Sequence, residues 1–133
     1  MQPRREQVNE CAENLLCGVN TPSQTDPDRM SDLEKKHVPV ITAPQTVARG
    51  ECFEVVIEVG KYLDHPSEPG HFINFVELYA DHTYLGRQHF VHSTVCPVAK
   101  FCVNLDHIHK ELRAFAWCNI HGTWEGDSPL TLT

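Results

Sequence analysis

The sequence predicts an all-β protein, an antiparallel β-sandwich that follows a short amphipathic helix and a linker. Short segments rich in β-branched and aromatic residues recur between turn-forming residues, with no helical pattern between them. A length of 133 residues and a hydrophobic content of 41% fit one globular domain plus an extension. We therefore expect an N-terminal helical extension and linker over residues 1–32 and a sandwich domain over residues 33–133.

The first expected element is a helix between residues 8 and 19. Apolar residues recur there at steps of three and four, which is the period of one helix face. They are Val8, Cys11, Ala12, Leu15, Leu16 and Val19, and Gly18 and Asn20 are suited to end the helix. The helix either packs on its own domain or docks on a neighbouring subunit. Residues 20–32 are rich in turn formers and poor in apolar residues, which is typical of a linker.

Five strands are expected after the linker. They cover residues 51–59, 71–80, 84–91, 100–105 and 112–117. Gly50 and Gly60 flank the first strand as turn residues, and three residues, 81–83, separate the second from the third, which suits a hairpin. Residues 106–110 connect the last two strands.

The charge balance and the absence of apolar runs narrow the choice of partners and location. A net charge of -7 argues against binding to nucleic acid or an anionic membrane, because those partners select basic patches. Arg4 and Arg5 are followed by polar residues where a twin-arginine export signal needs an apolar stretch. No run approaches the length of a transmembrane helix. We therefore expect a cytoplasmic protein.

Six cysteines, at positions 11, 17, 52, 96, 102 and 118, form no Cys-x-x-Cys pair and no evident disulfide framework. A chain of this size does not need disulfides for stability, so reduced thiols are expected. Cys52, Cys96 and Cys102 are expected to be small buried apolar residues, with Cys96 the more exposed because it precedes Pro97.

A candidate metal site combines one cysteine with four histidines. Cys118 and His121 lie three residues apart in a turn where Gly122 lets the backbone bend away, and His37, His65 and His71 lie upstream. Four imidazoles and one thiolate suit iron, zinc or copper, whereas five candidate ligands argue against a closed tetrahedral zinc site. If the imidazoles lie in a plane with the thiolate axial, the position opposite sulfur is open for redox chemistry on a small oxygen species.

The other five histidines are interpreted as surface or hydrogen-bonded residues. They are His82, His89, His92, His107 and His109. His107 and His109 would face the same side of a strand and allow a fortuitous surface zinc site, but nothing nearby would complete it.

Four motifs then resemble a known family, the superoxide reductases, also called neelaredoxins and desulfoferrodoxins. They are Lys36 with His37-Val38-Pro39-Val40-Ile41, the spacing from His65-Pro66 to His71, the strand Phe72-Ile73-Asn74-Phe75-Val76-Glu77-Leu78, and Cys118-Asn119-Ile120-His121-Gly122-x-Trp124. The resemblance runs from about Glu34 to Trp124 and keeps the order and spacings of the family.

The resemblance implies an immunoglobulin-like β-sandwich that carries one mononuclear iron per chain, cycling between Fe2+ and Fe3+. It implies His37, His65, His71 and His121 as equatorial ligands and Cys118 as the axial ligand. In this family ferrous iron gives one electron to superoxide, two protons are taken up, and hydrogen peroxide leaves without release of dioxygen. A rubredoxin-like donor re-reduces the iron, and one-iron members commonly assemble as homotetramers.

Lys36 matches the family's lysine beside the first histidine, whose ammonium attracts the superoxide anion; otherwise it is a solvated loop lysine. Many members have glutamate immediately before that lysine as the sixth ligand of oxidised iron, and this chain has Lys35 there. Glu34 is a candidate sixth ligand if the loop is rearranged; otherwise water, hydroxide or nothing fills that position.

The N-terminus departs from the two-iron members of the family. Those members carry a Cys-x-x-Cys pair and a later adjacent pair, whereas Cys11 and Cys17 have five residues between them. A second iron is therefore not expected. The alternative function is a non-catalytic metal-binding or electron-transfer β-sandwich with the same ligands, and a metal-free structural domain would leave the five residues unexplained.

Overall fold

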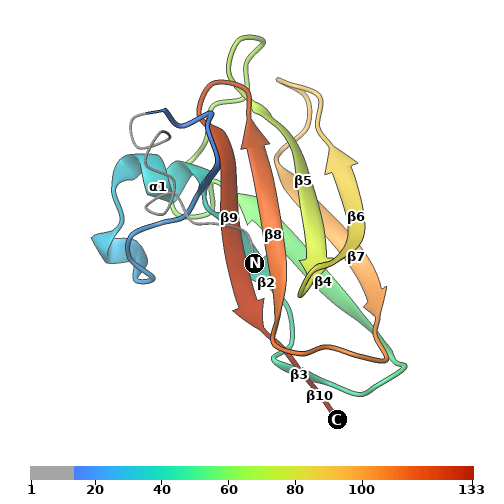
Figure 1. The fold of residues 1–133 in the computed structure, drawn as a ribbon. Helices are drawn as coiled ribbons and strands as arrows, with labels where there is room; N and C mark the ends of the chain where they lie inside the picture. Colours follow the sequence, from blue (N-terminus) through green and yellow to red (C-terminus); the bar gives the residue numbers. More distant parts are fainter. Residues whose placement is uncertain (1–13) are drawn as a thin grey trace.

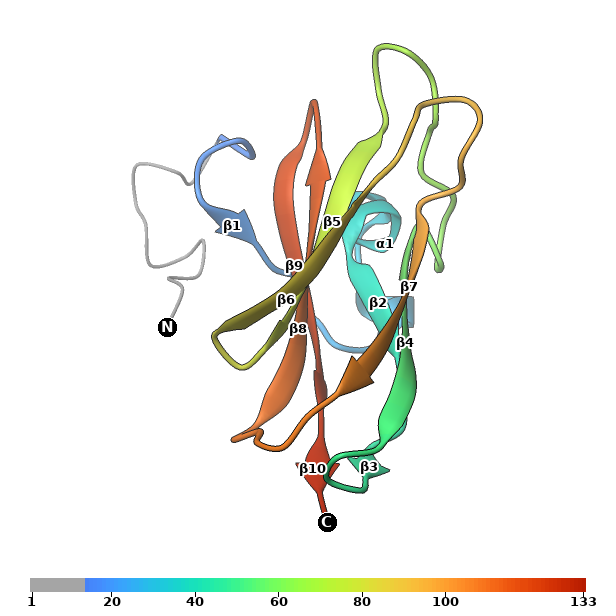
Figure 2. The same ribbon diagram turned by 90° about the vertical axis from the view of Figure 1, so that its right-hand side faces the viewer.

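The fold is described from a computed structural model over residues 14–133. Two sheets pack face to face, which confirms the predicted β-sandwich (Figure 1). The larger sheet has the order β1-β9-β8-β5-β6 and the smaller β2-β4-β7, while β10 and β3 form a short pair at the lower end. Figure 2 shows the two sheets as separate layers.

The strands of the larger sheet are β1 (Val19–Asn20), β5 (Ile73–Ala80), β6 (Thr83–His89), β8 (Glu111–Cys118) and β9 (Gly122–Pro129). Those of the smaller sheet are β2 (Pro39–Thr42), β4 (Cys52–Val59) and β7 (Val98–Asn104), and the short pair is β3 (Thr46–Val47) and β10 (Thr131–Leu132). A 3-10 turn covers Pro27–Arg29 and the helix α1 covers Asp32–His37. Within residues 14–133, no helix has the length and apolar character needed to cross a membrane.

Alternating side chains build the core between the sheets. In β4 every second residue is buried and the residues between them face outward or are half-buried, as a strand with one face on the core requires. The fully enclosed core residues include Val55, Ile57, Val76, Leu78, Ala99 and Ala114. All five predicted strands are confirmed, with boundaries within two residues.

Five strands were not predicted: the two-residue strands β1, β3 and β10, and the longer strands β2 and β9. β2 is four residues long and begins at Pro39, and β9 contains Gly126, Asp127 and Ser128, all of which are weak strand formers. Both strands form because they pair with strong neighbours: β2 with β4, and β9 with the whole length of β8.

The prediction of an N-terminal helix is wrong over the residues that the structure describes. Val8 to Ala12 lie outside them, and Leu15 to Asn20 form a turn and then the strand β1, which pairs with β9 in parallel. The Asn14 side chain accepts a hydrogen bond from the Leu16 backbone N–H at 3.0 Å, a turn contact that competes with helix formation. Gly18 has a φ of 79°, which ends any helix there.

The cysteines also differ from expectation. Cys17 is disulfide-bonded, so the expectation of reduced thiols is wrong for this residue. Cys52, Cys96, Cys102 and Cys118 are free, but the first three are exposed rather than buried. The β-sheet register explains the exposure of Cys52 and Cys102, because both lie on the outward face of the smaller sheet.

Candidate metal centre

The five predicted ligands come from three segments at one end of the sandwich. His37 is the last residue of α1, His65 and His71 lie in the long loop between β4 and β5, and Cys118 and His121 flank the turn between β8 and β9. These segments meet at the upper end of the molecule in Figure 1. The fold therefore brings all five residues together from positions up to 84 apart in sequence.

His37 is positioned by a short but well-capped helix. Ser31 and Glu34 form a capping box at the start of α1, with each side chain bound to the other's backbone N–H. The imidazole is buried, and its Nδ1 lies 2.7 Å from the carbonyl oxygen of Leu33. That contact requires the proton on Nδ1, so the lone pair of Nε2 points away from the helix into the cluster.

The same arrangement orients His65. Its Nδ1 lies 2.7 Å from the carbonyl oxygen of Pro66, which again leaves Nε2 as the free lone pair. The chain enters this loop through Gly60, which has a φ of 83° and where a Cβ would lie 2.9 Å from the backbone nitrogen of His65. His71 closes the loop through a pair of backbone hydrogen bonds with Glu68.

The four imidazole rings stand at the corners of a square. Ring centroids are 4.7 Å apart for His37 and His65, 4.7 Å for His65 and His71, 4.9 Å for His71 and His121, and 4.8 Å for His121 and His37. Across the square, His37 and His71 are 6.5 Å apart. Since that distance is close to the diagonal expected from the sides, the rings surround one point in the order 37, 65, 71, 121.

The imidazole nitrogens that face the centre of the square lie close together with no proton between them. His37 Nε2 lies 3.1 Å from His65 Nε2 and 3.2 Å from His121 Nδ1. Two imidazole nitrogens bound at right angles to one ion, each at about 2.1 Å, would be roughly 3 Å apart. His71 Nε2 is buried with no hydrogen-bond partner. Lone pairs this close repel unless a cation lies between them, so the donor set fits a metal ion.

Cys118 lies against the same point. Its Sγ is 3.4 Å from His65 Nε2 and 3.8 Å from His121 Nδ1, and the residue is fully buried. Burial raises the pKa of the Cys118 thiol, while hydrogen bonds from the backbone of Ile120 and His121 act in the opposite direction. A cation would replace the thiol proton, because a coordinating thiol is deprotonated. His37, His71, Cys118 and His121 offer donor atoms that all lie within 4.8 Å of one another.

Asn119 ties two ligand segments together. Its Oδ1 accepts a hydrogen bond from the Phe72 backbone N–H at 2.9 Å, and its Nδ2 donates to the Gly70 carbonyl at 2.9 Å. These bonds hold the backbone on both sides of His71 against the turn that carries Cys118. The sequence places Asn119 beside the cysteine, but only the tertiary structure identifies its partners.

Replacing Asn119 with alanine should weaken metal binding without unfolding the protein. Both side-chain bonds across the turn are lost, so His71 is held less firmly, and loss of a group that orients a ligand costs about 10-fold to 100-fold in metal affinity. Competition with a chelator measures the change. Ile120→Ala in the same turn is the control, since Ile120 is exposed, and equal affinities for the two variants would contradict this role.

Trp124 packs against the cluster of candidate ligands. Its ring stacks on His37 at 5.2 Å and 24°, and its Nε1 donates to the His121 carbonyl at 3.0 Å. The indole is 3% exposed, so it shields one side of the square from water. The sequence motif contains Trp124, but this contact with His37 was not predicted.

Burial makes the histidines poor bases. Desolvation is the main cause that lowers the pKa of His37 and of His65 to about 4, and the mutual repulsion of the imidazoles adds to it, although the bonds to Leu33 and Pro66 act in the opposite direction. Burial also lowers the pKa of His121. At neutral pH these imidazoles are therefore neutral and ready to bind a cation.

The metal-free protein should lose stability as the pH falls from 7.5 to 5. In this window the unfolded chain takes up protons on His37 and His65, whereas the folded chain, with pKa values of about 4, does not. We expect the midpoint of thermal unfolding to fall by at least about 4 °C, which corresponds to about 1 kcal/mol at this size. Calorimetry measures this midpoint as a function of pH. The control is His109→Gln, at an exposed histidine, which should leave the pH dependence of the midpoint unchanged. A midpoint independent of pH would contradict the buried neutral state.

Lys36 lies close enough to affect the cluster electrostatically. Its charge lowers the pKa of both His65 and His121. Glu34, the candidate sixth ligand, is engaged elsewhere: its carboxylate accepts hydrogen bonds from the backbone N–H of Ser23 at 2.6 Å and of Ser31 at 2.9 Å. These bonds lower its pKa against the effect of burial. Coordination by Glu34 would require both bonds to break.

The other histidines stay outside the cluster. Among them, His82 contacts Arg113 at 3.3 Å, and the rings of His89 and His92 pack on Phe75 and Phe72. Sequence reasoning missed the contributions of Leu33, Pro66, Ser23 and Ser31. The Ser31-x-x-Glu34 spacing is a recognisable capping box and was the signal for α1.

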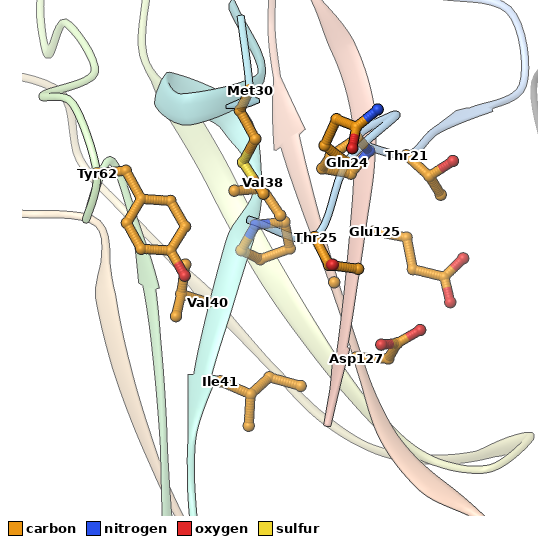
Figure 3. Close-up of a pocket in the computed structure, with 13 residues that line it drawn as sticks. Thr21, Gln24, Thr25, Met30, Val38, Val40, Ile41, Tyr62, Glu125 and Asp127 are labelled. Carbon is orange, nitrogen blue, oxygen red and sulfur yellow. The ribbon is translucent and has the colours of Figure 1, made fainter. Parts of the chain in front are cut away.

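A surface pocket of 370 Å³ lies beside the centre (Figure 3). Met30, Val38 and Tyr62 line its upper part, and the carboxylates of Glu125 and Asp127 stand along β9. None of the five candidate ligands lines it, and Glu125 is paired with Arg113 at 2.8 Å. We assign the pocket no part in metal binding.

Comparison with known proteins agrees with this geometry. The sequence model of the Desulfoferrodoxin family matches residues 29–127. A putative superoxide reductase of Methanocaldococcus jannaschii is 36% identical over 119 residues, which cover 87% of this chain and 96% of that protein. The superoxide reductase of Pyrococcus horikoshii is 36% identical over 105 residues, which cover 72% of this chain and 88% of that protein.

Solved structures give the same result. The superoxide reductase (neelaredoxin) of Ignicoccus hospitalis superposes with a TM-score of 0.72 at 28% identity, covering 86% of this chain and 95% of that chain. The structure of a putative superoxide reductase from Thermotoga maritima superposes with a TM-score of 0.66 at 30% identity. The superposition covers 74% of this chain and 87% of that chain. The chain belongs to the desulfoferrodoxin family.

Proposed function

We propose that the protein is a superoxide reductase, which reduces superoxide to hydrogen peroxide at a mononuclear iron held by His37, His65, His71, His121 and Cys118. The observation that supports this most strongly is the square of four imidazoles with a buried thiol against it. The superoxide reductases among the relatives and structural neighbours support the same reaction.

Each part of the chain has a role in this proposal. Superoxide reduction to hydrogen peroxide takes one electron and two protons, and ferrous iron bound at the square would supply the electron. The thiolate of Cys118 would increase the electron density that the metal can give. Trp124 and the buried ring of His37 exclude water from one side, and Asn119 holds the ligand segments in place.

Lys36 is the residue that we propose attracts the superoxide anion. Lys36→Ala should lower the bimolecular rate constant about 3-fold to 10-fold at low ionic strength, because one local positive charge is removed from a negatively charged protein. Pulse radiolysis measures this rate constant, and iron content should be unchanged. Lys35→Ala removes the same charge one residue earlier. If Lys36→Ala reacts at the original rate at low salt, or no more slowly than Lys35→Ala, the steering role is wrong.

The proposal also covers the electron donor, the assembly and the location of the protein. A rubredoxin-like protein would return electrons to the iron, the chain would assemble as a homotetramer, and the enzyme would act in the cytoplasm. The free thiols at Cys52, Cys96 and Cys102 support a reducing compartment, although the disulfide at Cys17 does not. The sandwich domain over residues 33–133 would carry the activity, with residues 1–32 as an extension.

Metal analysis combined with a superoxide assay tests the proposal. Protein produced with ample iron should contain about one iron per chain, because residues 14–133 hold one such cluster of donor groups. The reduced protein should convert superoxide to hydrogen peroxide without evolving dioxygen. Full occupancy by zinc under the same conditions would overturn the iron assignment. Iron that is reduced and oxidised reversibly but does not consume superoxide would favour an electron-transfer protein.

A further inference from the structure

Two free cysteines lie side by side on the outer face of the smaller sheet. Cys52 is the first residue of β4, and Cys102 lies in the neighbouring strand β7. In the antiparallel register Cys52 is opposite Asn104 and Cys102 is opposite Glu54, so the two cysteines occupy diagonal positions. Both are exposed, because they stand on the face that turns away from the core.

This pair is separate from the metal centre. β4 runs from Cys52 to Val59 and leads directly into the loop that carries His65. Seven residue steps along a strand span roughly 23 Å, so the pair and the centre lie at opposite ends of β4. No ligand of the centre touches the pair, and a small diffusing molecule is needed to link their chemistry.

The two sulfurs already interact. The Cys52 side chain is the main cause that raises the pKa of Cys102, and burial and the charge of Glu54 act in the same direction. The Asn104 Nδ2 also donates to the Cys52 sulfur, at 4.0 Å. The Cys52 sulfur thus accepts a hydrogen bond from Asn104, whereas the raised pKa of Cys102 favours its protonated thiol.

A bond between the sulfurs needs only a small adjustment. Diagonal neighbours in an antiparallel pair have Cα atoms about 7–8 Å apart, slightly beyond the usual span of a disulfide. Cys52 opens its strand, and the preceding Gly50 has a φ of 82° in a turn with open space around it. The end of a strand can shift more easily than its middle, and beyond Cys52 one backbone hydrogen bond, from the Gly50 N–H to the Leu105 carbonyl at 3.0 Å, still joins the two segments.

We propose that Cys52 and Cys102 form a second redox site, a dithiol that hydrogen peroxide oxidises to a reversible cross-strand disulfide. Hydrogen peroxide is the product of the proposed reaction at the iron, so the oxidant would arise on the same protein. The inference rests on the proposed function only for this source of peroxide. The chemistry of the pair itself depends on the two thiols alone.

The reaction balances in two steps. The sulfur of Cys52 attacks one oxygen of hydrogen peroxide, the O–O bond breaks, and Cys52 becomes a sulfenic acid as one water leaves. The sulfur of Cys102 then attacks the sulfur of Cys52, the S–O bond breaks, and a second water leaves. Two thiols lose two electrons and two protons, which the peroxide takes up. A small dithiol reductant restores the pair by thiol–disulfide exchange.

Mass spectrometry of the whole iron-loaded protein in its ferric form tests this. Treatment with stoichiometric hydrogen peroxide should lower the mass of the monomer by two hydrogen atoms relative to untreated protein. Peptide mapping without reductant should find Cys52 linked to Cys102, and dithiothreitol should reverse the link. Because Cys17 is disulfide-bonded before treatment, the untreated protein gives the baseline.

Three variants control the result. Cys52→Ser and Cys102→Ser should each lose the mass decrease, and Cys102→Ser should instead gain one or more oxygen atoms at Cys52. Cys96→Ser, at an exposed free cysteine elsewhere, should behave as the unmodified protein. Oxygen addition to the unmodified protein without the link, or a covalent dimer through Cys52 or Cys102, would overturn the inference.

A second arm separates this inference from the proposed function. The reduced protein is exposed to a superoxide source, with and without catalase. If added peroxide forms the link but superoxide does not, the dithiol site stands and superoxide reduction by the iron fails. If superoxide is consumed at the iron but neither treatment forms the link, the proposed function stands and the dithiol site is wrong.

Discussion

Cys118→Ser is expected to abolish superoxide reduction while leaving the fold intact. Cys118 is fully buried and serine has nearly the same shape, so packing changes little. The hydroxyl stays protonated where the thiol would give up its proton, and the metal loses its most electron-donating ligand. Since groups that only orient a ligand are worth about 10-fold to 100-fold, loss of the ligand itself should reduce activity by more than about 100-fold.

Three measurements separate the outcomes for this variant. Iron content shows whether the four imidazoles hold the metal alone, visible absorption of the ferric protein shows whether a sulfur-to-iron transition is lost, and pulse radiolysis gives the rate. Cys96→Ser is the matched control, because it makes the same change at an exposed free cysteine. A Cys118→Ser protein that reduces superoxide at the original rate would exclude the thiolate from the reaction.

Gly126→Ala should strongly destabilise the protein. The two sheets approach so closely here that a Cβ on Gly126 would lie 2.0 Å from the carbonyl oxygen of Pro39. Neither partner is a movable side chain, so β2 must shift away from β9. Overpacking of this kind costs about 3 kcal/mol or more. Because Pro39 follows His37 by two residues, the shift should also weaken metal binding.

Denaturant unfolding of the metal-free protein measures the stability, and chelator competition measures the second effect. Gly70→Ala is the control: it lies next to His71, yet a Cβ there meets nothing within 4 Å. It should change stability and metal affinity little. If Gly126→Ala is as stable as Gly70→Ala, the close approach of the two sheets is wrong.

Local patterns explain which parts of the fold were predictable. Alternating burial made strands such as β4 and β5 visible, because a strand with one face on the core repeats every second residue. After Trp124, β9 has no β-branched or aromatic residue, and it exists through its pairing with β8. The predicted N-terminal helix failed beyond Asn14 because an apolar period of three to four does not exclude a turn that Asn14 and Gly18 favour.

By itself, the sequence determined the kinds of ligand that the chain can offer. Four imidazoles and one thiol at loop edges of a β-sandwich predicted a nitrogen-rich centre with one sulfur, since ligand type depends on side-chain chemistry alone. Spacing also placed Cys118 and His121 on one turn. The order in which the rings surround a point was not predictable, because it depends on how three distant segments meet.

The tertiary structure decided that order and the bonds that fix it. It placed His37 opposite His71, stacked Trp124 on His37, and linked Asn119 to the backbone on either side of His71. In the tertiary structure Glu34 also caps α1, and Cys52 lies beside Cys102. Apart from the local cap of α1, these contacts join residues that lie far apart in sequence, so they form only when the chain has folded.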